Sequence, residues 1–150
     1  MPRTSFSVVT PLPPEAVLAA VTDFSERRLE IWPALDGSLY RLHARGDTWA
    51  EATEGGGPFP GMWARERYDW SRPGTVSAEI IESSIFRPGG RWELHVEPLS
   101  RGSRATVVWD RRPKGLKGLL VTALVVTVGR GPMADQLRQA LANYARLEAG

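Results

Sequence analysis

The chain has 150 residues, of which 42% are hydrophobic and 24% charged, a composition typical of one globular domain. The formal net charge of +2, without a basic stripe, argues against nucleic acid as a partner. The absence of cysteine excludes disulfides, thiolate metal sites and a cysteine nucleophile. Without a signal-peptide core or an apolar run long enough to cross a membrane, we expect a single cytoplasmic domain over residues 1–150, with no stable membrane insertion.

The N-terminal part of the chain predicts one strand followed by two short helices. Residues 4–10 alternate between apolar and polar side chains, which is typical of a strand. Residues 11–32 favour helices, and they open with prolines followed by Glu15. Proline is tolerated in the first helical turn, and a carboxylate there stabilises the positive end of the helix dipole. The second helix ends at Trp32, because the residue before a proline disfavours helical geometry.

Residues 37–111 predict six short strands, because alternating stretches are separated by glycine and proline. They pair as three hairpins if the apolar side chains are to share one face. The apolar pairs are then Tyr40–Ala52, Leu42–Ala50, Ala64–Ile80, Tyr68–Val76, Leu94–Val107 and Val96–Ala105, with Glu66 opposite Ala78. The same registers bring together opposite charges on the other face, namely Arg41–Glu51, Arg65–Glu79, Arg91–Asp110 and Glu97–Arg104.

Residues 115–148 return to a helical period, which Gly129 and Pro132 interrupt with a kink or a break. A long amphipathic helix and a one-faced antiparallel sheet each need a partner for their apolar side. The sequence therefore predicts an α+β fold. We expect a curved, seven-stranded antiparallel sheet, completed by residues 4–10, with the C-terminal helix across its concave face.

Two segments carry a family resemblance, residues 6–24 and the sequence Glu30-Ile-Trp-Pro33. With the order of elements over nearly the whole chain, they resemble the helix-grip fold of the START/Bet v 1-like (SRPBCC) superfamily. The closest resemblance is to its bacterial polyketide cyclase/dehydrase and lipid-transport group. This resemblance implies a deep apolar cavity between sheet and last helix, which holds a lipid, polyketide or similar hydrophobic molecule without a cofactor. Some members cyclise or aromatise a substrate and others only bind or carry one, and no catalytic motif is shared.

The predicted inner face mixes aromatic residues with alanines in the middle of strands, a combination that leaves room and lines it with flat apolar surface. We expect a ligand to contact Tyr40, Leu42, Ala50, Met62, Ala64, Glu66, Tyr68, Trp70, Ala78, Ile80, Trp92, Leu94, Val107, Trp109, Leu120 and Leu124. The alternative is a tightly packed core in which the last helix fills this space.

Glu66 is the one ionisable residue that these registers place in mid-strand on the inner face. A buried carboxylate is costly unless it is paired, hydrogen-bonded or neutralised. It could anchor a polar ligand group, exchange protons together with Tyr40 or Tyr68, or form a structural pair with an inward arginine. An isolated carboxylate would favour binding, and a hydrogen-bonded Glu–Tyr or Glu–Arg pair would favour catalysis.

The histidines and glycines give weaker signals. His43 and His95 fall on the outer face, and with so few ligand types a metal site is not expected. The run from Gly55 to Pro58 lacks the Gly-Lys-Ser/Thr ending of a phosphate loop, so it predicts a strand connection or a flap over the cavity mouth.

A basic cluster precedes the apolar run over residues 118–128, and it consists of Arg111, Arg112, Lys114 and Lys117. A membrane-facing patch would have this pattern. We favour a solvated loop that enters a core helix.

Together these features predict binding of a hydrophobic small molecule between the sheet and the C-terminal helix. The first alternative is a cyclase/dehydratase-type enzyme that uses Glu66 and a tyrosine. The second is a lipid carrier that contacts membranes through the basic cluster.

Overall fold

The elements follow one another in the predicted order. The computed structural model describes residues 3–57 and 61–150. In chain order the elements are β1 (Thr4–Thr10), α1 (Pro14–Val21), α2 (Arg28–Ile31), β2 (Arg41–Arg45), β3 (Trp49–Gly55), β4 (Trp63–Asp69), β5 (Thr75–Ser83), β6 (Arg91–Pro98), β7 (Ser103–Asp110), α3 (Gly115–Thr127) and α4 (Arg130–Ala149).

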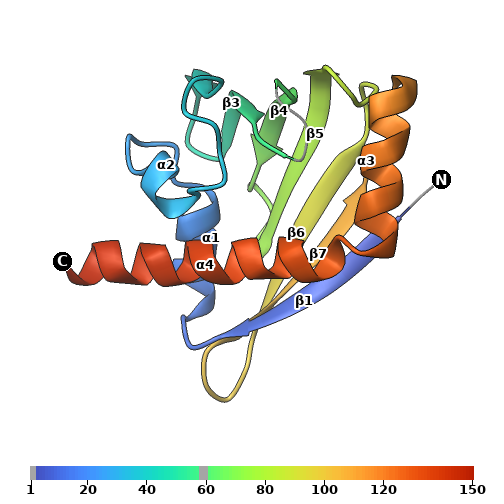
Figure 1. The fold of residues 1–150 in the computed structure, drawn as a ribbon. Coiled ribbons are helices and arrows are strands. Elements are labelled where there is room, and N and C mark those ends of the chain that lie inside the picture. The colour runs from blue at the N-terminus through green and yellow to red at the C-terminus, as the bar shows by residue number, and fades with distance from the viewer. Residues whose placement is uncertain (1–2, 58–60) are drawn as a thin grey trace.

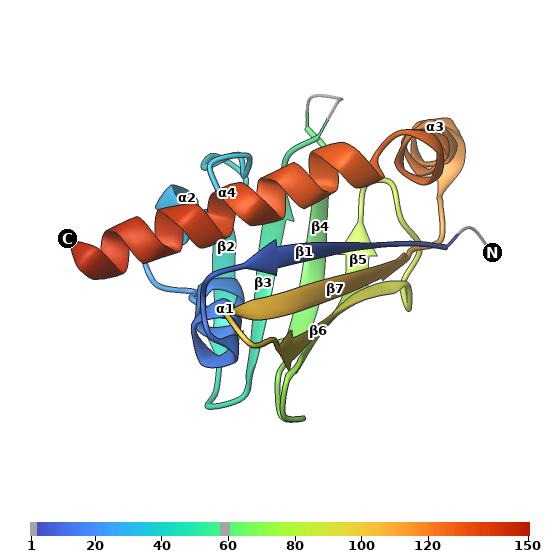
Figure 2. The ribbon, with the colours of Figure 1, turned by 90° about the horizontal axis from the view of Figure 1, so that it is seen from below.

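The strands form one seven-stranded sheet in the order β1-β7-β6-β5-β4-β3-β2, and every neighbouring pair is antiparallel. The N-terminal strand thus joins the other six through β7, as predicted. Figures 1 and 2 show α4 lying across one face of this curved sheet. The predicted architecture is therefore confirmed.

One half of the sheet packs directly against helices. Ala50, Ala52, Ala78 and Ala105 share a buried cluster with Val17 and other side chains of α1 and α4. Small side chains lower the surface of the sheet, so that a helix can approach it closely. The interpretation of Ala50 and Ala78 as cavity-lining is therefore wrong, because both are fully buried in this packed cluster.

The β6–β7 register is as predicted, with Leu94 opposite Val107 and Arg104 bonded to Glu97 at 3.2 Å. The predicted β2–β3 register is wrong. Leu42 lies opposite Ala52, and a bulge at residue 43 adds one residue to β2. The apolar pattern of the sequence carries no signal for a bulge of this kind.

The predicted β4–β5 register is also wrong, because Tyr68 pairs with Ala78 and Glu66 with Ile80. The turn is longer than the predicted one at residues 72–73, since β4 ends at Asp69 and β5 begins at Thr75. The β5 partner of each of these two residues lies two positions later than predicted, and side chains along a strand alternate with a period of two. The inward orientation of Glu66 and Tyr68 is consequently preserved.

The predicted charge pair between Arg65 and Glu79 is absent for the same reason. Arg65 instead bonds Glu51 on β3, and Glu79 accepts from Arg91 at 2.8 Å. Arg41 lies opposite Thr53 rather than Glu51.

The C-terminal helical region is broken into α3 and α4, whose axes differ by 81°. Pro132 falls in the first turn of α4, where its missing N–H leaves no helical hydrogen bond unmade. No single helix in the described ranges is long and apolar enough to cross a membrane, and α3 with α4 meets those criteria only as this bent pair.

Candidate functional site

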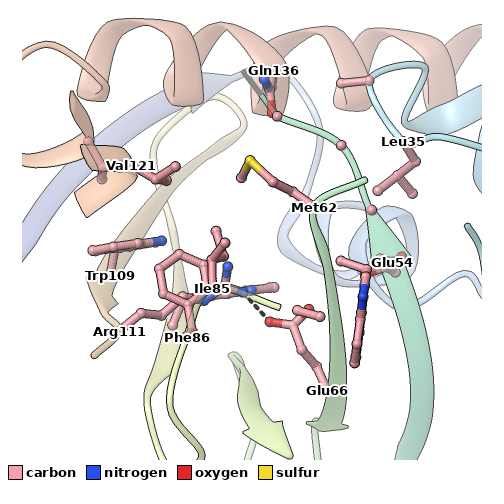
Figure 3. A pocket seen from close by; sticks show the side chains of 18 of the residues that line it. Leu35, Glu54, Met62, Glu66, Ile85, Phe86, Trp109, Arg111, Val121 and Gln136 are labelled. Atoms are coloured by element: carbon pink, nitrogen blue, oxygen red, sulfur yellow. Dashed lines mark hydrogen bonds and ion pairs between the residues drawn. The ribbon is translucent and has the colours of Figure 1, made fainter. Parts of the chain in front are cut away.

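A cavity of about 340 Å³ lies between the sheet, α3 and the start of α4 (Figure 3). Its lining consists of Trp32, Ala34, Leu35, Glu54, Gly55, Gly56, Gly57, Met62, Trp63, Ala64, Glu66, Tyr68, Ile85, Phe86, Trp92, Trp109, Arg111, Val121, Val125 and Gln136. Ala34, Gly56, Gly57 and Gln136 are exposed, so they form the mouth. In Figure 3, Gln136 lies at the end opposite Glu66 and Arg111, with Met62 between them.

Several predicted ligand contacts lie on the cavity wall, namely Met62, Ala64, Glu66, Tyr68, Trp92 and Trp109. Others belong to the core beneath α1 and α4 or pack against it, namely Tyr40, Leu42, Ala50, Trp70, Ala78, Leu94 and Val107. Ile80 is buried in a second core cluster. Leu120 and Leu124 are 48% and 45% exposed and point away from the interior. None of these other residues lines the cavity. For Leu120 and Leu124 the reason is the break before α4, which turns α3 away from the axis of a single long helix.

The assignment of Glu66 as the one inward ionisable residue is wrong, because Glu54 is also buried and lines the cavity. Alternation along β3 places residue 54 on the same face as Ala52, so the sequence contained this signal. Arg111 continues the alternation past Trp109 in the same way. Its inward side chain contradicts its assignment to a solvated basic cluster.

A chain of buried polar groups begins beside the cavity at Arg28 and continues along the cavity floor. Arg28 Nε donates to Glu54 Oε2 at 2.6 Å, and the Tyr68 hydroxyl donates to Glu54. The same hydroxyl lies 3.3 Å from Glu66 Oε2, and Glu66 forms an ion pair with Arg111 (Figure 3). We call Arg28, Glu54, Tyr68, Glu66 and Arg111 the buried polar chain.

The buried polar chain shifts the ionisation of its members. Burial raises the pKa of the Glu66 carboxyl, and the neighbouring Arg111 charge opposes this effect only in part. Burial, followed by the nearby Glu54 carboxylate, raises the pKa of the Tyr68 hydroxyl well above its usual value. Tyr68 therefore keeps its proton at neutral pH and remains a hydrogen-bond donor.

Arg111 holds one donor that no described residue accepts from. Its Nε is buried and has no hydrogen-bond partner among the described residues. Its guanidinium also lies 5.2 Å from the centre of the Phe86 ring, another part of the cavity wall. A buried N–H without a partner is costly, so an acceptor that reached Arg111 would gain a strong hydrogen bond.

The remaining sequence candidates lie away from the cavity floor. His43 and His95 are exposed, and His43 Nε2 lies 2.7 Å from Thr53 Oγ1. Within residues 3–57 and 61–150, no group of three or more histidine, cysteine, aspartate or glutamate residues is arranged to hold a metal ion. Gly56 and Gly57 lie at the cavity mouth, whereas Pro58 lies outside the described residues.

Comparison with known proteins gives one family and many structural relatives. Residues 1–146 match the family described as polyketide cyclase / dehydrase and lipid transport. No curated protein sequence is significantly similar to the chain.

Three solved structures illustrate the structural similarity. TTHA0849 from Thermus thermophilus has a TM-score of 0.78 at 13% identity, and the alignment covers 97% of this chain and 99% of that protein. The Zhui aromatase/cyclase of a Streptomyces species has a TM-score of 0.73 at 16% identity, and the alignment covers 96% of this chain and 93% of that protein. A START superfamily protein from Mycobacterium smegmatis gives 0.70 at 17% identity, with coverage of 98% and 97%.

At these identities the structural matches establish the fold, and the family match adds the sequence relationship. The chain therefore belongs to the polyketide cyclase/dehydrase and lipid-transport family and has the helix-grip fold of the START/Bet v 1-like superfamily.

Proposed function

We propose that the protein binds an uncharged hydrophobic small molecule that carries an oxygen acceptor, such as a carbonyl group, in the cavity above the buried polar chain. The observation that carries this proposal is the Arg111 side chain, which lines an otherwise mostly apolar cavity and whose buried Nε has no partner among the described residues. The apolar walls would hold the body of the ligand, and Arg111 would hold its oxygen.

The size of the cavity limits the ligand. About 340 Å³ is at the lower end of the range of roughly 300–1,000 Å³ found for small-molecule pockets. Trp92 and Trp109 offer flat surfaces, which favour planar ring systems. A compact molecule of one to three fused rings fits these walls better than an extended acyl chain.

The charges of the site argue against an anionic ligand. The buried polar chain contains two arginines and two glutamates, so its formal charge balances. An added carboxylate would leave one buried negative charge in excess, and an unpaired buried charge is strongly unfavourable. An uncharged acceptor satisfies Arg111 without disturbing this balance.

A matched pair of probes tests the proposal. Acetylnaphthalene and ethylnaphthalene have similar size, but only the first carries a carbonyl oxygen. We expect both to change the fluorescence of the wall tryptophans, with acetylnaphthalene binding about tenfold more tightly, since hydrogen bonds to charged groups contribute about 1.5–3 kcal/mol. Equal affinities would contradict the role of Arg111, and no binding of either probe would contradict the cavity as a ligand site.

Single substitutions test whether the two probes bind in the cavity beside Arg111. Arg111→Lys keeps a cation beside Glu66 but removes the Nε donor, so the tenfold preference should disappear while ethylnaphthalene binds as before. Arg112→Lys is the matched control at the exposed neighbouring position. Ala64→Leu should fill the cavity and weaken both probes, whereas Ala44→Leu, on the exposed side of β2, should leave binding unchanged.

The pairing of Glu66 favours a second candidate, an acid–base enzyme of the cyclase/dehydratase kind. Glu66 has both a tyrosine and an arginine partner, the arrangement that favours catalysis over simple anchoring. The Glu66 carboxylate would remove a proton from the carbon next to a bound carbonyl group. The electron pair would move onto the carbonyl oxygen, which Arg111 would stabilise.

Proton exchange measures this chemistry without a known substrate. In deuterated water, the methyl protons of bound acetylnaphthalene should exchange faster than in free solution, as followed by NMR. Glu66→Gln should remove the acceleration while binding survives. Exchange at the free rate in the unaltered protein would leave ligand binding alone as the function.

A further inference from the structure

The helix α3 presents a row of large aliphatic side chains to solvent. Leu116, Leu119, Leu120, Leu124 and the following Val128 are between 45% and 74% exposed. Leu116, Leu120, Leu124 and Val128 recur every four residues, and Leu119 lies three residues after Leu116, so the set shares one side of the helix. We call this set the outer α3 face. Exposed apolar clusters of this kind mark interaction surfaces more often than isolated exposed leucines do.

The opposite side of α3 packs against the rest of the protein. Gly118, Val121 and Thr122 are buried, and Val121 also lines the cavity. Figure 1 shows α3 at the margin of the molecule, far from α1 and α2, with its axis turned away from α4. The sequence expectation of a core helix is therefore wrong, because α3 buries only one of its two apolar sides.

Basic residues occur near both ends of α3 along the chain, and one of them, Lys114, also donates from Nζ to Ser83 O at 2.6 Å. Arg112, Lys114, Lys117 and Arg130 are exposed, and the sequence contains no acidic residue between Asp110 and Asp135. Among the described residues, none of these four cations is part of an ion pair. Some arginines elsewhere on the surface pair with glutamates, as Arg104 does with Glu97.

We propose that the outer α3 face docks on an anionic lipid bilayer, with the leucines inserted among the acyl chains and the four cations at the headgroups. A helix with this combination of aliphatic and basic side chains binds in the plane of the membrane interface. The turn of 81° between α3 and α4 allows α3 to lie in that plane while α4 stays on the sheet. This proposal is independent of the identity of the ligand in the cavity.

The same charges argue against a second copy of the chain as the occupant. In a symmetric dimer the same surface meets itself. The four cations would then face four like charges, and this segment has no acidic residue to compensate them.

Vesicle flotation tests the proposal. At low salt we expect the protein to float with vesicles of equal parts phosphatidylglycerol and phosphatidylcholine, and to partition at least about tenfold less into pure phosphatidylcholine. Physiological salt should weaken binding to the anionic vesicles because it screens the cations. Equal partition into both vesicles, or into neither, would overturn the proposal.

Matched double variants separate the apolar and the electrostatic contributions. Leu120→Ser with Leu124→Ser should abolish flotation. Val9→Ser with Ile81→Ser, which alters two exposed apolar side chains of the sheet, should not. Circular dichroism and thermal unfolding check that each variant is folded.

For charge, Lys117→Glu with Arg130→Glu should weaken partition by at least about fivefold per altered side chain. Arg41→Glu with Arg101→Glu, at exposed positions away from α3, is the control. Unchanged flotation in the leucine variant would overturn the proposal. A dimer in sedimentation equilibrium that the leucine variant dissociates would assign the outer α3 face to a second copy instead.

Discussion

Glu54 and Glu66 lie on the same side of adjacent strands, yet each depends on a different arginine. Glu54 is held by Arg28 from α2, and Glu66 by Arg111 from the end of β7. The Tyr68 hydroxyl joins the two pairs. Because all five groups are largely shielded from water, loss of one partner leaves another buried charge uncompensated.

The Arg28–Glu54 pair can be tested by removing the cation. Arg28→Met should lower the free energy of unfolding by about 3–5 kcal/mol, because it leaves the Glu54 carboxylate buried without its partner. Urea denaturation measures this change. Arg104→Met, which breaks the exposed pair with Glu97, should cost less than about 1 kcal/mol. Similar losses of unfolding free energy in both variants would show that burial of the ion pair does not determine how destabilising its removal is.

The raised pKa of Glu66 predicts how stability depends on pH. In the unfolded chain this carboxyl titrates near its ordinary value of 4.5, whereas folding raises its pKa. Between the two pKa values the folded state binds more protons than the unfolded state, so this contribution to stability is full below the lower value and is lost as pH rises through the higher one. The Glu66→Gln variant has no carboxyl group at this position, so its stability lacks this pH-dependent contribution.

Paired urea titrations over a range of pH measure this linkage. We expect the free energy of unfolding of the unaltered protein to fall relative to that of Glu66→Gln as pH rises from about 4 towards neutrality. A difference that stays constant with pH, or that moves in the opposite direction, would contradict a raised pKa.

At the scale of elements, the two helices of the C-terminal region, α3 and α4, pack against different parts of the protein. α4 packs its Leu137 and Leu141 on the sheet beside α1 and closes the core. α3 instead contributes Val121 to the second core cluster and to the cavity wall. The break between them is what leaves the cavity open beside Gln136.

Close approach of α3 to the segment after β5 depends on Gly118. A Cβ atom at this position would lie 2.3 Å from the backbone oxygen of Ile85. Gly118→Ala should therefore move α3 outward and speed amide hydrogen exchange within α3, although alanine is the better helix former. Gly131→Ala in α4 meets nothing within 4 Å, so it should leave exchange in α3 unchanged. Equal exchange in the two variants would show that the Gly118 contact does not hold α3.

At the scale of the whole molecule, the helix-grip fold provides rigid walls for a cavity, and ligand binding should stabilise the folded state. With acetylnaphthalene at about 100 times its dissociation constant, the free energy of unfolding should rise by about 2.7 kcal/mol. Thermal unfolding with and without the probe measures this. In the Ala64→Leu variant the probe should raise the free energy of unfolding only slightly. An equal increase in that variant would place the binding site elsewhere.

The fold could be predicted from the sequence because it depends on periodicity. Alternation with a period of two assigns each strand residue to a face, and this assignment survives a shift of two residues. Glu66 and Tyr68 thus point inward although their predicted partners on β5 were wrong. The same rule applied to residues 54 and 111 would have identified most of the buried polar chain.

The location of the cavity was decided only by the tertiary structure. Ala64 and Ala78 have the same residue type and the same inward orientation, but α1 and α4 cover the region of Ala78, whereas open space remains beside Ala64. Leu120 has the spacing of a core residue, yet the break before α4 turns it to solvent. Local sequence determines which side of an element is apolar. Which apolar side is covered, and by what, depends on how distant elements pack, and that information is not contained in any local pattern.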